Sequence, residues 1–141
     1  MEQLLDEPEW LWGTAFAFVF ILVLFVMAVR NTRQQIAQTR QHRANPTREE
    51  FMAMLANDVS QASASFVWEV MQDILPRQLA PHPDDDMVKD LPLDAEEWRL
   101  DWPGQFARMQ GIDEDRIPDW PKTWEPTVRN YARWLELGLK P

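Results

Sequence analysis

The sequence predicts an all-α protein: a single N-terminal transmembrane helix followed by a small cytoplasmic helical domain with proline- and Trp-rich loops. The first observation is the uncharged apolar run at residues 10–29, WLWGTAFAFVFILVLFVMAV. The second is that apolar residues recur every three or four positions after Thr47, which is the period of one helix face. The third is that eleven prolines punctuate 141 residues, so the helices after the span should be short.

The apolar run is long enough to cross a bilayer. At about 1.5 Å of rise per residue, about twenty helical residues span about 30 Å, the thickness of the hydrocarbon core. Its length and the acidic, base-free segment before it, residues 1–9, differ from a cleaved signal peptide, so we expect an uncleaved helix. Gly13 and Ala17 lie four apart, the small-xxx-small spacing at which membrane helices pack closely. That spacing would suit packing on a larger membrane complex or a homodimer, although ordinary lipid-facing composition explains it more simply.

The residues after the run predict the orientation. Five arginines precede the first acid, Glu49, and they are Arg30, Arg33, Arg40, Arg43 and Arg48. Such a cluster marks the cytoplasmic side, so we expect a bacterial-type inner membrane protein with its acidic tail (1–9) outside. Trp10 and Trp12 should anchor the helix at the outer interface, and Arg30 and Arg33 at the inner one. The linker (30–46) should be solvated, and its bases between Arg30 and Arg43 suit anionic lipid headgroups.

The domain (47–141) begins with a clear helix signal. Thr47-Arg48-Glu49-Glu50 is a capping box, and the apolar stripe after it ends at Pro76. The stripe predicts one helix, or two helices broken near Asn57-Asp58 or in the serine-rich SQASAS segment. Its second half, residues 65–75, suits either a core or a partner-facing surface, and we favour the core.

The rest of the domain predicts shorter helices. Asp94 should cap a helix that stops near Trp102, before Pro103-Gly104, and residues 105–109 should form another. The last helix should have Pro126 in its first turn and Gly138 just after its end. The acidic segment at 81–101 should be a surface loop. Its Asp84-Asp85-Asp86 run lacks the alternating spacing of a calcium loop, so we expect no metal site.

The composition argues against an enzyme. There is no cysteine, and the two histidines, His42 and His82, are forty positions apart. No phosphate loop, nucleophile elbow or metalloprotease motif occurs, so we expect neither catalysis nor a cofactor. The net charge of −9 argues against nucleic acid as a partner.

Eight tryptophans are the most distinctive part of the composition. Trp98, Trp102, Trp120 and Trp124 lie in the proline-broken region and are our candidates for a partner-contact surface, since tryptophan is enriched at interface hot spots. The alternative is that they fill a core built without long helices.

Four pieces of residues 64–139 occur in a recognisable order. They are the helix SFVWEVMQDIL, the acidic turn Val88-Lys89-Asp90-Leu91, the pair Asp94-Ala95, and the helix start Pro126-Thr127-Val128. In this order they resemble the acyl carrier protein family, a small helical bundle. In that family the serine of an Asp-Ser-Leu motif carries phosphopantetheine, whereas here Ala95 takes its place. The resemblance therefore implies a degenerate relative that cannot carry an acyl chain at this position.

Two functions are compatible with these patterns. The leading hypothesis is a non-enzymatic, single-pass accessory or assembly subunit that packs its helix on a larger integral membrane complex and docks its acidic Trp-rich domain on a partner. The alternative is a degenerate acyl-carrier-like or regulatory module tethered to the membrane.

Overall fold

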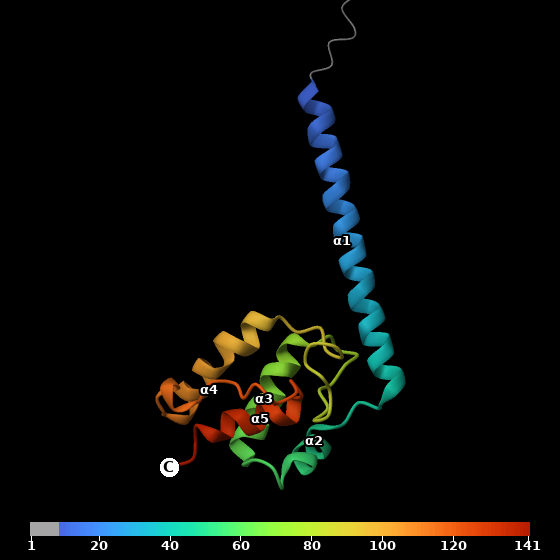
Figure 1. Ribbon diagram of the computed structural model, residues 1–141. Coiled ribbons are helices and arrows are strands. Elements are labelled where there is room, and N and C mark those ends of the chain that lie inside the picture. The colour runs from blue at the N-terminus through green and yellow to red at the C-terminus, as the bar shows by residue number, and fades with distance from the viewer. Residues whose placement is uncertain (1–8) are drawn as a thin grey trace, which may run out of the picture. The chain divides into compact units, whose positions relative to one another are not determined.

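The computed structural model describes residues 9–141, with side chains from residue 11, and this part is helical (Figure 1). Its α-helices are α1 (Glu9–His42), α2 (Arg48–Leu55), α3 (Gln61–Ile74), α4 (Trp102–Gln110) and α5 (Val128–Leu137). A π-helix, η1 (Glu97–Asp101), precedes α4, and a 3-10 helix, η2 (Glu114–Arg116), follows it. The described part contains no strand, only an isolated bridge between Asp86 and Thr127. The predicted all-α class is confirmed.

The chain divides into two compact units, the first ending at Gln34 and the second comprising Gln35–Pro141. In the first unit, α1 exposes large apolar side chains on all sides, among them Phe16 (76%), Phe18 (74%) and Phe25 (64%). Among the described residues, α1 is the one helix long and apolar enough to cross a membrane. The acidic tail predicted before it lies outside the described residues except for the backbone of Glu9, and the side chain of Trp10 lies outside them too.

The linker predicted at 30–46 is helical as far as His42, because arginine and glutamine favour helices. Trp12, Gly13, Ala17, Arg30 and Arg33 all have exposed positions on α1. Nothing lies within 4 Å of a β-carbon built on Gly13. The predicted roles of these residues in helix packing and interfacial anchoring stay predictions.

The core of the second unit forms where α3 packs against both α2 and α5 (Figure 1). Phe51, Phe66, Phe106 and Tyr131 are almost completely buried, and the rings of Phe66 and Phe106 are 5.1 Å apart. The predicted helical stripe is divided into two helices. The capping box at Thr47 begins α2, and the hydroxyl of Ser60 accepts a hydrogen bond from Ser63 N–H to begin α3.

Two predicted helix boundaries in the second half were wrong. Pro103-Gly104 does not end a helix, because η1 continues directly into α4 and Pro103 is the second residue of α4. Pro126 does not lie in the first turn of α5, since Thr127 is its N-cap and accepts from Asn130 N–H. Gly111 adopts a left-handed conformation (φ 67°) and ends α4.

Candidate binding cleft

A cleft of about 600 Å³ opens between η1, the loop after η2, and α5. Its apolar lining consists of three tryptophans, three prolines and one isoleucine: Trp98, Trp120, Trp134, Pro103, Pro118, Pro126 and Ile117. Three charged side chains, Arg99, Glu114 and Asp119, complete the lining. This volume lies within the range of typical ligand sites, which are largely apolar with a few polar groups.

Tyr131 lies at the centre of the aromatic cluster beneath the cleft. Its ring centroid is 5.9 Å from that of Trp98, 6.0 Å from Trp102 and 5.5 Å from Trp134. Such tilted and edge-on contacts are favourable for aromatic pairs. Desolvation by burial raises the pKa of Tyr131 well above its usual value.

The hydroxyl of Tyr131 donates a hydrogen bond of 2.6 Å to the carbonyl of Trp98. Local sequence explains why that carbonyl is available. The N–H of Trp102 bonds to Glu97 five residues back, and the next residue, Pro103, has no N–H to donate. A π turn followed by proline therefore leaves the Trp98 carbonyl without a donor from its own helix, and Tyr131 from α5 supplies one.

The four predicted contact residues have different positions in the structure. Trp98 and Trp102 are each only 4% exposed and pack mainly in the core, but Trp98 also lines the cleft whereas Trp102 does not. Trp120 and Trp124 are half-buried, and Trp120 lines the cleft. Trp134 of α5, which was not among the predicted contact residues, also lines the cleft. Its place could not be predicted because the contact joins segments far apart in sequence.

The charged residues of the cleft differ in their surroundings. The guanidinium of Arg99 lies 4.8 Å from the ring centroid of Trp98, a cation–π contact. Glu114 packs on α4, where a β-carbon at Gly104 would lie 3.0 Å from its Oε2. Glycine at 104 thus allows this close approach. Glu114 and Asp119 are exposed and make no ion pair in the part of the chain that the structure describes.

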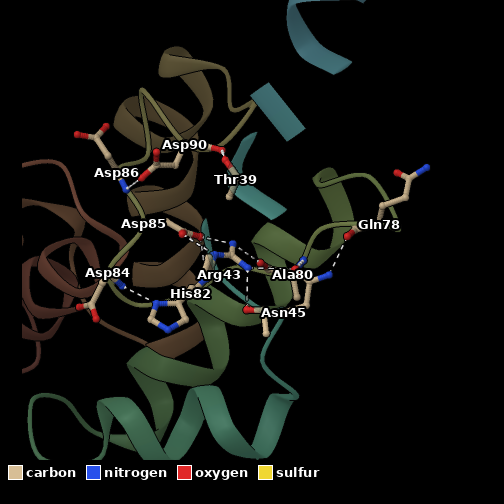
Figure 2. Close-up of polar contacts among 11 residues, drawn as sticks. Thr39, Arg43, Asn45, Gln78, Ala80, His82, Asp84, Asp85, Asp86 and Asp90 are labelled. Atoms are coloured by element: carbon tan, nitrogen blue, oxygen red, sulfur yellow. Dashed lines mark hydrogen bonds and ion pairs between the residues drawn. The ribbon is translucent and has the colours of Figure 1, made fainter. Parts of the chain in front are cut away.

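A second polar arrangement joins the C-terminal end of α1 to the loop at 78–91 (Figure 2). Arg43 donates two hydrogen bonds to the carboxylate of Asp85, of 2.7 and 2.5 Å, and one of 2.7 Å to the carbonyl of Ala80. Thr39 donates to the carbonyl of Asp90 at 2.6 Å. We define the contacts of Thr39 and Arg43 with Ala80, Asp85 and Asp90 as the polar latch.

The polar latch corrects the predictions of a surface acidic run and a solvated linker at three positions, Asp85, Thr39 and Arg43, whereas Asp84 and most of the linker are exposed. Asp85 is 4% and Thr39 6% exposed, and Arg43 is engaged by Asp85 and not free for lipid headgroups. Gln35, Thr39 and Arg43 are spaced by four residues, so they share one helix face. This polar periodicity was the signal that could have revealed the contact.

The three consecutive aspartates have three different partners. Asp85 pairs with Arg43 (Figure 2). Asp84 pairs with Arg129 at 3.2 Å, and Asp86 accepts from the N–H groups of Val88 and Lys89. Among the described residues, no group of three or more histidine or acidic side chains could hold a metal ion. The run is therefore explained by contacts within the protein.

Together the fold and the cleft define a class: a helical protein with one long apolar N-terminal helix and a second unit that carries an aromatic cleft. No family model matches the chain, and no curated protein or solved structure shows significant similarity to it.

Proposed function

We propose that this protein is a non-enzymatic, single-pass membrane accessory or assembly subunit. In this proposal α1 lies in the bilayer against a larger membrane protein complex, and the second unit docks on a partner protein through its aromatic cleft. The observation that carries the proposal is the exposure of large apolar side chains along residues 11–27 of α1. An exposed apolar surface of this extent is typical of membrane or protein contact.

The lining of the cleft supports binding over catalysis. Its residues are aromatic rings, prolines, one isoleucine, two carboxylates and one guanidinium, and none of them is a histidine, serine or threonine. Nucleophilic catalysis requires a nucleophile beside a base. Buried aromatic anchors surrounded by charged groups are instead typical of interface hot spots.

The proposal includes an orientation. The N-terminus lies outside and the second unit in the cytoplasm of a bacterial-type cell. Arg30, Arg33 and Arg40 are exposed and make no ion pair among the described residues, so their charges are available for the inner face of the membrane and its anionic lipids. Arg43 is excluded from this role by its place in the polar latch.

The test is purification of the full-length protein from its native membrane in mild detergent, with mass spectrometry of what accompanies it. We expect a membrane complex in stoichiometric amount. Exchange of residues 10–29 for an unrelated membrane span should abolish that recovery while the protein still inserts. Recovery of the protein alone as monomer or dimer, with the native span present, would contradict the accessory-subunit proposal.

A carrier-like or regulatory module is the second candidate. Asp94 accepts a hydrogen bond of 2.9 Å from Glu96 N–H, and a helical turn begins at Ala95, the place of the modified serine in acyl carrier proteins. Because alanine has no hydroxyl, this candidate binds partner enzymes without a prosthetic group at this position. The intact mass distinguishes the two candidates: a covalent prosthetic group anywhere on the chain would favour the carrier-like module.

A further inference from the structure

A proline-rich segment of the chain lies beside the cleft and is bound by one indole from α5, while a second indole bonds within the segment. The segment from Pro118 to Pro126 contains three prolines and no helix. The indole N–H of Trp134 donates to the carbonyl of Pro118 at 2.7 Å, and that of Trp120 donates to the carbonyl of Trp124 at 3.3 Å. Two indoles therefore donate to backbone carbonyls of non-helical, proline-flanked chain.

A third indole in the cleft also has an N–H donor, but among the described residues no backbone carbonyl accepts from it. Trp98 lines the cleft and is 96% buried, and its N–H makes no hydrogen bond in the described part of the chain. No fully buried side-chain nitrogen there lacks a partner, so this N–H keeps contact with solvent. An indole that is nearly buried usually finds an acceptor. The open volume beside Trp98 is where one could enter.

The charge at the cleft favours a basic ligand. Glu114 and Asp119 are exposed without an ion pair among the described residues, whereas the single base, Arg99, lies against Trp98. The lining thus has an excess of one negative charge, and the chain as a whole carries −9. Complementary charge steers association and selects among partners.

We infer that the cleft binds an extended, proline-containing segment of a partner protein with a lysine or arginine beside the proline. A polyproline II segment has no internal hydrogen bonds, so its carbonyls are free to accept from Trp98 N–H, and its preformed shape limits the entropy lost on binding. Its proline rings would lie against Trp120 and Trp134, which line the cleft beside the chain's own Pro118 and Pro126. This inference rests on the proposed function and names the partner's chemistry.

The test uses the full-length protein in a non-ionic detergent with its tryptophans ¹⁵N-labelled. The probe is a synthetic peptide that repeats Pro-Pro-Lys, compared with peptides in which glycine replaces proline or glutamate replaces lysine. We expect the Pro-Pro-Lys peptide to shift the Trp98 indole resonance and to bind more tightly than both control peptides. Trp98→Phe keeps a smaller aromatic ring but removes the N–H donor, so affinity should fall about fivefold to tenfold.

Two further variants keep the test independent of folding. Trp68→Phe, at a half-buried tryptophan of α3 that contacts Phe51 and does not line this cleft, should leave affinity unchanged. Asp119→Lys changes only an exposed residue and reverses its charge. It should therefore weaken binding of the Pro-Pro-Lys peptide and strengthen binding of the Pro-Pro-Glu peptide.

Equal binding of the glycine and proline peptides, unchanged affinity in Trp98→Phe, or no binding at millimolar peptide would overturn the inference. Failure of the inference is distinguishable from failure of the proposed function. If a membrane complex is recovered with the protein but the peptide does not bind, only the identity of the ligand is wrong. If no membrane complex is recovered with the native protein, the proposed function itself is wrong.

Discussion

At the scale of single residues, Tyr131 is the most informative position. It is fully buried, contacts four tryptophan rings and satisfies the carbonyl of η1 that Pro103 leaves without a donor. Its hydroxyl thus links α5 to η1 beneath the cleft. Removing this one oxygen should disturb both the stability of the second unit and the position of Trp98.

We predict that Tyr131→Phe lowers the free energy of unfolding by about 1–3 kcal/mol, because it leaves a buried carbonyl unsatisfied. Pro103→Ala should reduce this loss, since alanine at 103 restores an N–H that can bond within the helix. Urea denaturation of the full-length protein and of the single and double variants measures the coupling. Strict additivity of the two changes would show that Pro103 is unrelated to the Tyr131 hydrogen bond.

A second prediction at this residue concerns alkaline pH. Burial raises the pKa of Tyr131, so above pH about 10 the unfolded chain loses this proton while the folded chain keeps it. The folded state then binds more protons, and its stability falls as pH rises, by up to about 1.4 kcal/mol per pH unit from this group. Below pH about 10 the group contributes no pH dependence.

Ultraviolet absorbance can follow this titration directly, because Tyr131 is the only tyrosine in the chain. Tyrosinate should appear near pH 10 in denaturant but only at higher pH, together with unfolding, in the native protein. The alkaline loss of stability should be smaller in Tyr131→Phe. A native titration near pH 10 without unfolding would contradict the burial argument.

At the scale of elements, the polar latch makes the end of α1 a part of the second unit. Asp85→Ala should lower the free energy of unfolding by about 3–5 kcal/mol, since Arg43 would keep a buried charge without its partner. Amide exchange in residues 82–91 should become faster. The double variant Asp85→Ala with Arg43→Met should recover part of the loss, because it removes both charges.

The neighbouring aspartate offers a matched control. The side chain of Asp84 is 68% exposed and its 3.2 Å contact with Arg129 lies at the surface, so Asp84→Ala should cost less than about 1 kcal/mol. Similar losses in Asp84→Ala and Asp85→Ala would show that the latch does not stabilise the second unit beyond an ordinary surface pair.

Elements with local signals were predictable from the sequence and elements with distant causes were not. The cap at Thr47, the alternative of two helices before Pro76, and Gly138 after the last helix all depend on residues within a few positions. The continuous η1–α4 segment was missed because a π turn lets the helix continue through Pro103. The carbonyl left free by that turn is bonded by Tyr131, about thirty residues away. The polar latch was missed because its partners are also far apart in sequence.

At the scale of the whole molecule, the candidate cleft was predictable in composition but not in geometry. The excess of tryptophan pointed to residues 98–124, yet which rings are buried depends on how α5 brings Tyr131 and Trp134 to them. Of the predicted contact residues, Trp98 and Trp120 line the cleft, Trp124 is half-buried and Trp102 belongs to the core. The membrane helix and its orientation were predicted from composition alone and remain proposals.

The orientation of the full chain gives the last prediction. The chain has no cysteine, so single cysteines introduced at Glu2 and Lys122 report separately on the two ends. In intact cells an impermeant thiol reagent should label the cysteine at Glu2 but not that at Lys122, and permeabilisation should expose both. Labelling of the Lys122 site in intact cells, or loss of the Glu2 site from the mature protein, would contradict an uncleaved helix with a cytoplasmic second unit.

The basic residues after the span should control this orientation to different degrees. Arg30, Arg33 and Arg40 are exposed, so their replacement by glutamine should remove most of the positive-inside signal and increase labelling of the Lys122 site in intact cells. The matched change Arg43→Gln should leave labelling nearly unchanged but destabilise the second unit, since Arg43 is bound to Asp85. An equal effect of Arg43 on orientation would show that its charge acts on the membrane before the latch forms.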